Sequence, residues 1–109
     1  MQVVVSECGI AEANGNYKRS QKLQDGVVYY VKRGGEWKGR TNISFVIYRK
    51  TQRGGSKSWL LGVASEGQST QLLYRNTNNG GSSTPPFDGW VATSRGSQSL
   101  PKLKWVNRS

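Results

Sequence analysis

Histidine is absent from this chain, cysteine occurs once and acidic residues number only six. Without histidine there is no imidazole base, no Ser-His-Asp triad and no histidine-containing zinc site. A single cysteine cannot build a thiolate zinc cluster or close a disulfide within the chain. The six carboxylates are scattered, and neither a GxxxxGK[ST] loop nor a GxGxxG motif occurs. We therefore expect a protein that is not an enzyme and that uses no metal and no cofactor.

Long apolar runs are also missing. Apolar residues make up 34% of the chain and the mean hydropathy is −0.67, and no run approaches the roughly 18 residues of a membrane span. The apolar stretch Val3 to Val5 is too short for the core of a secretory signal. With a single cysteine, this pattern favours one domain over residues 1–109, located inside the cell in the cytoplasm or on the cytoskeleton.

Positive charge is what the chain has in excess. Sixteen Lys and Arg residues give a formal net charge of +10. Nearly all of this excess lies between Lys18 and Lys57, where eleven basic residues are accompanied only by Asp25 and Glu36. A charge concentrated in one segment can set up a directional field, which bears on partners and association. The partner class that this predicts is acidic: an acidic protein surface or a nucleic acid.

Short alternating runs, separated by Gly, Asn and Ser, take the place of helical periodicity throughout the chain. Four Trp, five Tyr and two Phe compensate for the low apolar content, because each aromatic side chain buries a large area. We expect an all-β fold, a compact antiparallel β-sandwich or barrel of about eight short strands. The predicted strands are Val3 to Ser6, Asn16 to Lys22, Gly26 to Lys32, a short piece around Trp37, Ile43 to Arg49, Trp59 to Ala64, Gln71 to Arg75, Gly89 to Thr93 and Lys102 to Val106.

The hairpin from Ile43 to Ala64 is the clearest element of the sequence, because both of its strands alternate and its tip carries Gly54-Gly55. We expect it to be the centre of stability. A second buried aromatic, Trp90, should enter the core behind Pro85-Pro86, whose rings fix an extended backbone. The hairpin side chains predicted to be buried are Phe45, Ile47, Trp59 and Leu61.

Basic residues are predicted to gather at one end of the domain. If Gly34-Gly35 is the turn after the strand Gly26 to Lys32, and if consecutive strands are antiparallel neighbours, several cations meet there. We call this set the predicted basic pole: Lys32, Arg33, Arg49, Lys50, Arg53, Lys57 and Arg75. These side chains should be mostly exposed, without acidic partners inside the chain, and should bind an anionic partner. The alternative is that they are solvated turn residues that also protect edge strands from aggregation.

Two features would favour RNA as the partner. Arg33-Gly34-Gly35 and Arg53-Gly54-Gly55 match RGG elements, although two isolated copies at hairpin bends are more simply turn chemistry. Three aromatic residues close to the cations could stack on bases, namely Trp37, Tyr48 and Tyr74. The alternative for these aromatics is the core, since the chain is poor in Leu and Ile.

Several short motifs form one series along the chain: Asn14-Gly15-Asn16-Tyr17, Asp25-Gly26 with Tyr29 or Tyr30, Gly35-Glu36-Trp37, Phe45-Val46-Ile47-Tyr48-Arg49, Lys57-Ser58-Trp59-Leu60-Leu61, Pro85-Pro86-Phe87-Asp88-Gly89-Trp90 and Leu100-Pro101-Lys102-Leu103. The series resembles a small β-rich module of the NGxY…Y…W…W…PPxxGW type, found in eukaryotic and particularly in protist and algal proteins. The resemblance covers most of the chain and implies a non-catalytic interaction domain. The module often has Gly-Xaa-Pro-Xaa-Tyr after the first turn, and Gly26-Val27-Val28-Tyr29 lacks that proline.

The function that these observations favour is a non-catalytic binding or structural module that docks an acidic surface within a larger assembly. The acidic tails of tubulin on a microtubule or ciliary lattice, or another acidic protein, would fit the charge. One alternative is an RNA-binding protein in which the same cations contact phosphates. A second alternative is a glycan-binding module that uses exposed Trp and Tyr.

Overall fold

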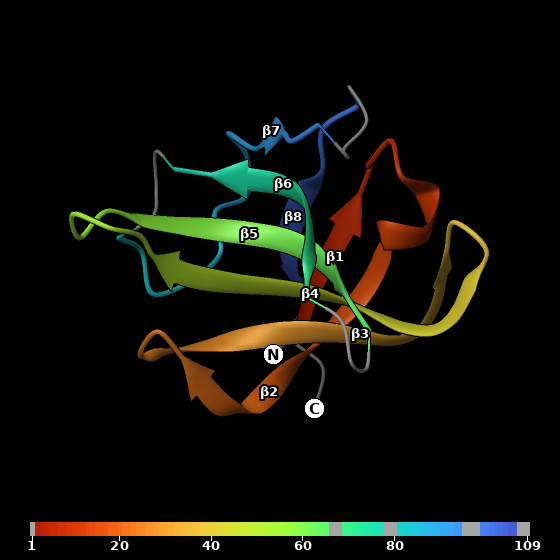
Figure 1. The fold of residues 1–109 in the computed structure, drawn as a ribbon, viewed down its shortest axis with the longest axis horizontal. Helices are drawn as coiled ribbons and strands as arrows, with labels where there is room; N and C mark the ends of the chain where they lie inside the picture. The colour runs from red at the N-terminus through yellow and green to blue at the C-terminus, as the bar shows by residue number, and fades with distance from the viewer. Residues whose placement is uncertain (1, 66–68, 78–80, 95–98, 107–109) are drawn as a thin grey trace.

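The computed structural model describes residues 2–65, 69–77, 81–94 and 99–106, and their strands form a single antiparallel sheet (Figure 1). The order across the sheet is β7-β6-β5-β4-β3-β2-β1-β8. A short 3-10 helix, Ala11–Ala13, links the first two strands. The strands are β1 (Gln2–Ser6), β2 (Gly15–Gln24), β3 (Val27–Trp37), β4 (Arg40–Thr51), β5 (Lys57–Ala64), β6 (Gln71–Asn76), β7 (Val91–Ala92) and β8 (Lys102–Val106).

The sheet curls so strongly that it forms a half-barrel. From β1 to β7 each strand pairs with the next one in the chain, and β8 returns to pair with β1. Figure 1 shows the result, with β1 and β8 lying across from β4, β5 and β6. Register shifts occur in β2–β3, in β3–β4 and in β5–β6, and such bulges increase local twist and bending. The expected all-β class with eight antiparallel strands is confirmed.

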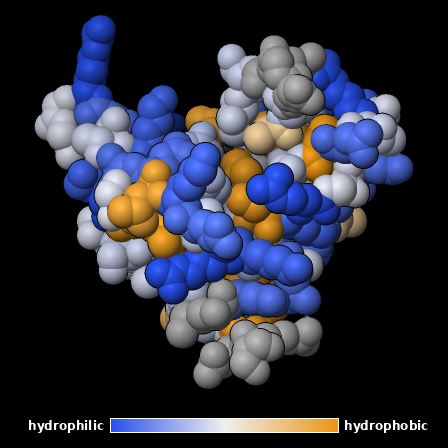
Figure 2. Space-filling model, turned by 90° about the horizontal axis from the view of Figure 1, so that it is seen from below, coloured by the Kyte–Doolittle hydropathy of each residue, from blue (hydrophilic) through white to orange (hydrophobic). Residues whose placement is uncertain are grey.

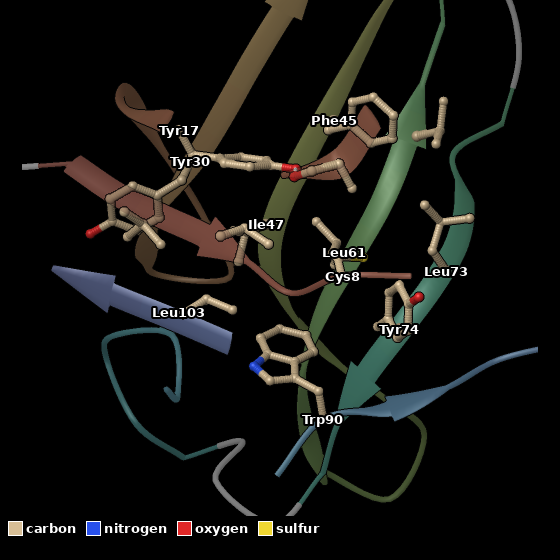
Figure 3. Close-up of a cluster of buried hydrophobic side chains, with 14 of the residues drawn as sticks. Cys8, Tyr17, Tyr30, Phe45, Ile47, Leu61, Leu73, Tyr74, Trp90 and Leu103 are labelled. Atoms are coloured by element: carbon tan, nitrogen blue, oxygen red, sulfur yellow. Dashed lines mark hydrogen bonds between the residues drawn. The ribbon is translucent and has the colours of Figure 1, made fainter. Parts of the chain in front are cut away.

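The core fills the inner, concave side of the half-barrel. Figure 3 shows side chains from β1, β8 and the β4–β6 strands meeting there around Trp90. The expected hairpin residues Phe45, Ile47, Trp59 and Leu61 are each 0% exposed. Trp90 is 1% exposed, and its Nε1 donates to the carbonyl oxygen of Pro86 at 3.0 Å. The predicted core is therefore confirmed in both of its parts.

The prediction of a turn at Gly34-Gly35 was wrong. The strand β3 does not end at Lys32 but runs on to Trp37, and the turn into β4 falls at Lys38-Gly39, both with positive φ. Gly34 and Gly35 instead belong to an irregular stretch of β3, where the register against β4 shifts. A Cβ at Gly35 would lie 2.9 Å from the Phe45 ring. Glycine is therefore needed there for close packing, and the separate piece around Trp37 was a wrong prediction.

Candidate binding surface

The predicted basic pole is divided between the two ends of the sheet. Because β3 and β4 are antiparallel over their whole length, Arg33 pairs with Ser44 and lies at the opposite end from Arg49. Lys32, opposite Phe45, is near Arg33. The prediction that these two residues share an end with the others was wrong. The misplaced turn at Gly34-Gly35 is the cause, since it reversed the assumed direction of the chain one strand too early. The members that do share one end are Arg49, Lys50, Arg53, Lys57 and Arg75.

At that end, Arg49 is not an exposed cation. Its residue is only 8% exposed, and its Nε donates to the Asp25 carboxylate at 2.9 Å while Nη2 donates to the Asp25 carbonyl at 2.7 Å. Thr51 donates to the same carboxylate at 2.6 Å, and Lys57 Nζ lies 3.9 Å from it. We call these four residues the Asp25 network. The expectation of free cations was therefore wrong for Arg49 and Lys57.

The Asp25 network also holds a distant loop. The carbonyl oxygen of Ser82 accepts a bond from Arg49 Nη1 at 3.1 Å and another from Trp59 Nε1 at 3.1 Å. The hydrogen bond from Thr51, the hydrogen bond from Arg49 and the nearby charges of Lys57 and Arg49 hold the pKa of Asp25 below its ordinary value, against a smaller opposing effect of desolvation. These contacts close this end of the half-barrel, so their role is structural.

Lys32 is also engaged within the chain. By its register it lies on the inner side opposite Phe45, and its Nζ is 5.8 Å from the centre of that ring. The ammonium donates to the carbonyl oxygens of Glu12 at 2.7 Å and Asn14 at 2.6 Å. These bonds attach β3 to the segment between β1 and β2. Lys32 was therefore wrongly expected to be a free cation.

The three predicted stacking residues are largely buried. Trp37 is 6% exposed, with Lys38 Nζ 4.7 Å above its ring. Tyr74 is 0% exposed, and its hydroxyl donates to the Ser99 carbonyl at 3.3 Å. Tyr48 is 9% exposed, and burial raises the pKa of its hydroxyl. The expectation that these rings are accessible for stacking was wrong, because all three are buried by packing against other side chains.

The outer, convex side of the sheet carries a continuous row of side chains. Residues directly opposite each other on neighbouring strands share a face of a sheet. Starting from Lys18 on β2, the register leads to Val31, then to Val46, Gly62 and Leu72 on the strands that follow. The row is basic on β2 and apolar from β3 to β6. Figure 2, which views the molecule from below Figure 1, shows apolar surface between hydrophilic side chains.

A hollow of about 600 Å³ lies over β2 and β3. We call it the basic hollow. Four of its cations, Lys18, Arg19, Lys22 and Arg33, are exposed, and none of them forms an ion pair with a described residue. No Asp or Glu of the described ranges lines it. Its lining residues are Asn16, Lys18, Arg19, Ser20, Gln21, Lys22, Tyr29, Val31, Lys32 and Arg33.

A second hollow of about 590 Å³ lies further along the same face, over β2 to β6. We call it the apolar hollow. Tyr29 lines both hollows and so joins them. Lys50 is the single cation of the described residues that lines the apolar hollow, again without an acidic neighbour in the lining. The lining residues are Gln24, Tyr29, Val46, Tyr48, Lys50, Ala64, Ser69, Thr70 and Leu72.

The apolar hollow sits on a layer of side chains that is separate from the core. Tyr48 and Leu60 lie opposite each other on β4 and β5 and are buried, yet neither belongs to the core cluster. Next to them, Gly62 leaves the row without a side chain. A Cβ at Gly62 would lie 2.8 Å from the Gln71 carbonyl oxygen, so the first residue of β6 packs directly on this glycine. Gly62 is therefore covered by the Thr70-Gln71 segment, and Thr70 is one of the residues that line the apolar hollow.

Reasoning from the sequence did not identify Lys18, Lys22, Tyr29 and Val46 as members of a surface. One signal was present. The run Val27-Val28-Tyr29-Tyr30-Val31 is apolar on both faces of its strand. A strand at the centre of a curled sheet needs apolar residues on its inner face alone. Apolar residues on the other face are therefore a mark of further contacts on the outside.

Comparison of the chain with protein-family models, with curated proteins and with solved structures finds no significant match. In the described ranges, no three His, Cys, Asp or Glu side chains lie together in a way that could hold a metal ion. The same part of the chain has no helix with the length and apolar character that a membrane crossing would require. The candidate surface therefore rests on its own geometry.

Proposed function

We propose that the protein is a non-catalytic binding module, and that it docks an acidic macromolecular surface on the basic hollow. The observation that carries this proposal is the lining of that hollow, where the exposed cations Lys18, Arg19, Lys22 and Arg33 occur and no acidic residue is found among the described lining residues. Unpaired cations in a concave site focus their field on an anionic partner and raise its association rate. The site replaces the predicted basic pole, whose members Arg49 and Lys57 are taken up by Asp25.

An acidic protein is the partner we favour. It would be met inside the cell, and the acidic tails of tubulin on a microtubule or ciliary lattice belong to this chemical class. The resemblance to a eukaryotic interaction module agrees with such a role. A glycan-binding role has little to support it, because Trp37, Trp59 and Trp90 are buried and Trp105 packs edge-on against Tyr30 with 5.5 Å between ring centres.

RNA is the second candidate. It is supported by Tyr29, a half-buried ring beside the cations of the basic hollow. Sequence-independent binding of single strands combines a cationic groove with successive stacked bases. A platform for several bases would need more than one open ring, and Tyr48, the other tyrosine on this face, is 9% exposed. The aromatic content of the surface thus favours an acidic polypeptide over RNA.

The test is a binding titration with fluorescence anisotropy. A labelled oligoglutamate peptide, the corresponding oligoglutamine peptide and a single-stranded RNA of similar length are titrated with the protein at low and at physiological salt. We expect the oligoglutamate to bind, the oligoglutamine not to bind, and the affinity to fall with salt because exposed charges are screened over about 8 Å. The triple variant Lys18→Gln, Lys22→Gln, Arg33→Gln should bind about tenfold more weakly.

A matched control variant has the same net charge as this triple variant. The triple variant Lys38→Gln, Arg53→Gln, Lys102→Gln also removes three positive charges, from residues that line neither hollow. It should lose less than about threefold in affinity. Equal losses in the two triple variants would mean that net charge alone drives binding, and the proposed site would be wrong. Tighter binding of the RNA, weakened further by Tyr29→Ala, would favour the second candidate.

A further inference from the structure

The outer face offers two adjoining hollows of different chemistry, and the proposed function uses only the basic one. The apolar hollow is lined by the half-buried side chains of Tyr29, Val46 and Leu72 and by the buried Tyr48. Its polar lining includes one cation, Lys50, which lies at the end of β4. An acidic run by itself would leave this hollow unused. A partner that fills both hollows must carry an apolar group next to its negative charges.

We infer that the partner is an extended acidic peptide segment with one apolar anchor residue. The acidic run lies on the basic hollow, and the anchor, a side chain of about the size of Leu or Phe, enters the apolar hollow beyond Tyr29. This inference rests on the proposed function and specifies it, since it names the form of the acidic partner. Charge complementarity fixes which part of the segment lies over β2 and β3, because the free cations are there.

The arrangement of the strands sets the spacing within such a segment. Lys18 and Gly62 belong to the same outer row and are separated by three strand intervals, from β2 to β5. At about 4.8 Å per interval this distance is about 14 Å. An extended peptide advances by about 3.3 Å per residue, so the anchor follows or precedes the acidic residue bound by Lys18 by about four residues. The peptide crosses the strands and does not pair with an edge.

The structure of the row explains why the anchor is accepted at that point. Val46 and Leu72, the neighbours of Gly62 on the row, are half-buried and line the apolar hollow, while Gly62 itself is covered by the Gln71 carbonyl and the Thr70 methyl group. Backbone groups in this part of the sheet are already paired on both sides, so the contact is made by side chains. Burial of apolar area contributes free energy that depends little on salt. The acidic run, in contrast, contributes a part that salt weakens.

A second copy of the same chain does not suit this surface as an occupant. Its formal net charge is +10, and like charges facing each other across an interface disfavour association. RNA would bring negative charge but no aliphatic anchor. The acidic peptide is the occupant that matches both hollows at once.

The experiment varies the peptide first, so that folding of the protein is not disturbed. Three labelled peptides share one oligoglutamate run: one has only Gly and Ser beyond it, one has a Leu about four residues beyond it, and one has the Leu directly next to it. We expect the peptide with the spaced Leu to bind about tenfold tighter than the peptide without Leu, and the peptide with the adjacent Leu to gain less than threefold. The gain from the spaced Leu should stay the same at low and physiological salt.

Protein variants then locate the anchor. Val46→Ser and Leu72→Ser should each remove most of the gain from the spaced Leu and leave the affinity for the plain acidic peptide unchanged. Val4→Ser is the matched control, since Val4 pairs with Asn16 on β2 and lines neither hollow. It should keep the full gain. Thermal unfolding of each variant shows that it is folded at the assay temperature.

The outcomes separate this inference from the proposed function. If the plain acidic peptide binds and the spaced Leu adds nothing, the anchor site is wrong and the proposed function stands. If no acidic peptide binds, both are wrong. If the gain is present but persists in Val46→Ser and Leu72→Ser, the anchor lies elsewhere and the inference fails. If RNA binds more tightly than every peptide, the partner class itself is overturned.

Discussion

Two regions of this protein are rich in the same residue types and use them in opposite ways. In the Asp25 network, Arg49 and Lys57 face inward and share one carboxylate. In the basic hollow, Lys18, Lys22 and Arg33 are exposed and form no ion pair with a described residue. The difference shows that the charge of a segment gives its electrostatic potential but not its role. The face of the strand on which a cation lies decides whether it bonds within the fold or is available to a partner.

The first prediction concerns the stability of the end of the half-barrel that contains the Asp25 network. The substitution with the largest expected effect there is Trp59→Ala. Trp59 is 0% exposed and donates to the same Ser82 carbonyl as Arg49. We expect a loss of about 3–5 kcal/mol in the free energy of unfolding, because the substitution leaves a large cavity. Urea denaturation followed by tryptophan fluorescence measures it. A loss below about 1 kcal/mol would contradict the view that this hairpin is the centre of stability.

The contrast itself is tested by the same substitution at two arginines. Arg49→Met removes three hydrogen bonds from a residue that is 8% exposed, and it should lower the free energy of unfolding by about 1.5–3 kcal/mol. Arg33→Met, on the exposed outer face, should change it by less than about 0.5 kcal/mol. Urea denaturation of both variants gives the two values. In the peptide titration the order should reverse, with Arg33→Met the weaker binder. Similar losses of stability in both variants would remove the distinction between the two regions.

The alternation of apolar residues was enough to predict most of the fold. The alternation of Ile43, Phe45 and Ile47 identified the inner face of β4. The boundaries of β8 were predicted as they occur. The same period of two also places Arg49 inward, since it lies two residues after Ile47. That deduction was available from the sequence alone. The partner of Arg49 was not available, because Asp25 lies in another turn and is brought there only by the folded sheet.

The irregular part of β3 was beyond prediction for a different reason. Gly34-Gly35 has the composition of a turn, and local chemistry favours a turn at such a pair. The extended path through it is selected by packing, since Gly35 lies against the ring of Phe45 on the neighbouring strand. The outer row could not be deduced for the same reason. It depends on the register of four strand pairs, and the shift near Gly35 alters the relation between β3 and β4.

The smallest effect that separates the two regions is a dependence of stability on pH. The hydrogen bond from Thr51, with those of Arg49 and the charge of Lys57, holds the pKa of Asp25 in the folded protein below its ordinary value. A carboxyl group with a lower pKa in the folded state stabilises the fold at pH values above its unfolded pKa of about 3.9. This contribution is lost as the pH falls through the folded pKa. The network should therefore weaken below about pH 4.

The measurement is thermal unfolding of the wild type and of Asp25→Asn from neutral to acid pH. At neutral pH the variant should unfold at the lower temperature, because Arg49 and Lys57 lose their counter-charge. Below about pH 4 the two unfolding temperatures should converge, since the wild-type carboxyl is then protonated as well. Glu36→Gln, which changes an exposed carboxylate of β3, is the control for the loss of one negative charge and should follow the wild type closely. A difference between wild type and Asp25→Asn that stays constant across this range would mean that the charge of Asp25 does not stabilise this end of the half-barrel, and that its hydrogen bonds alone hold Arg49 inside.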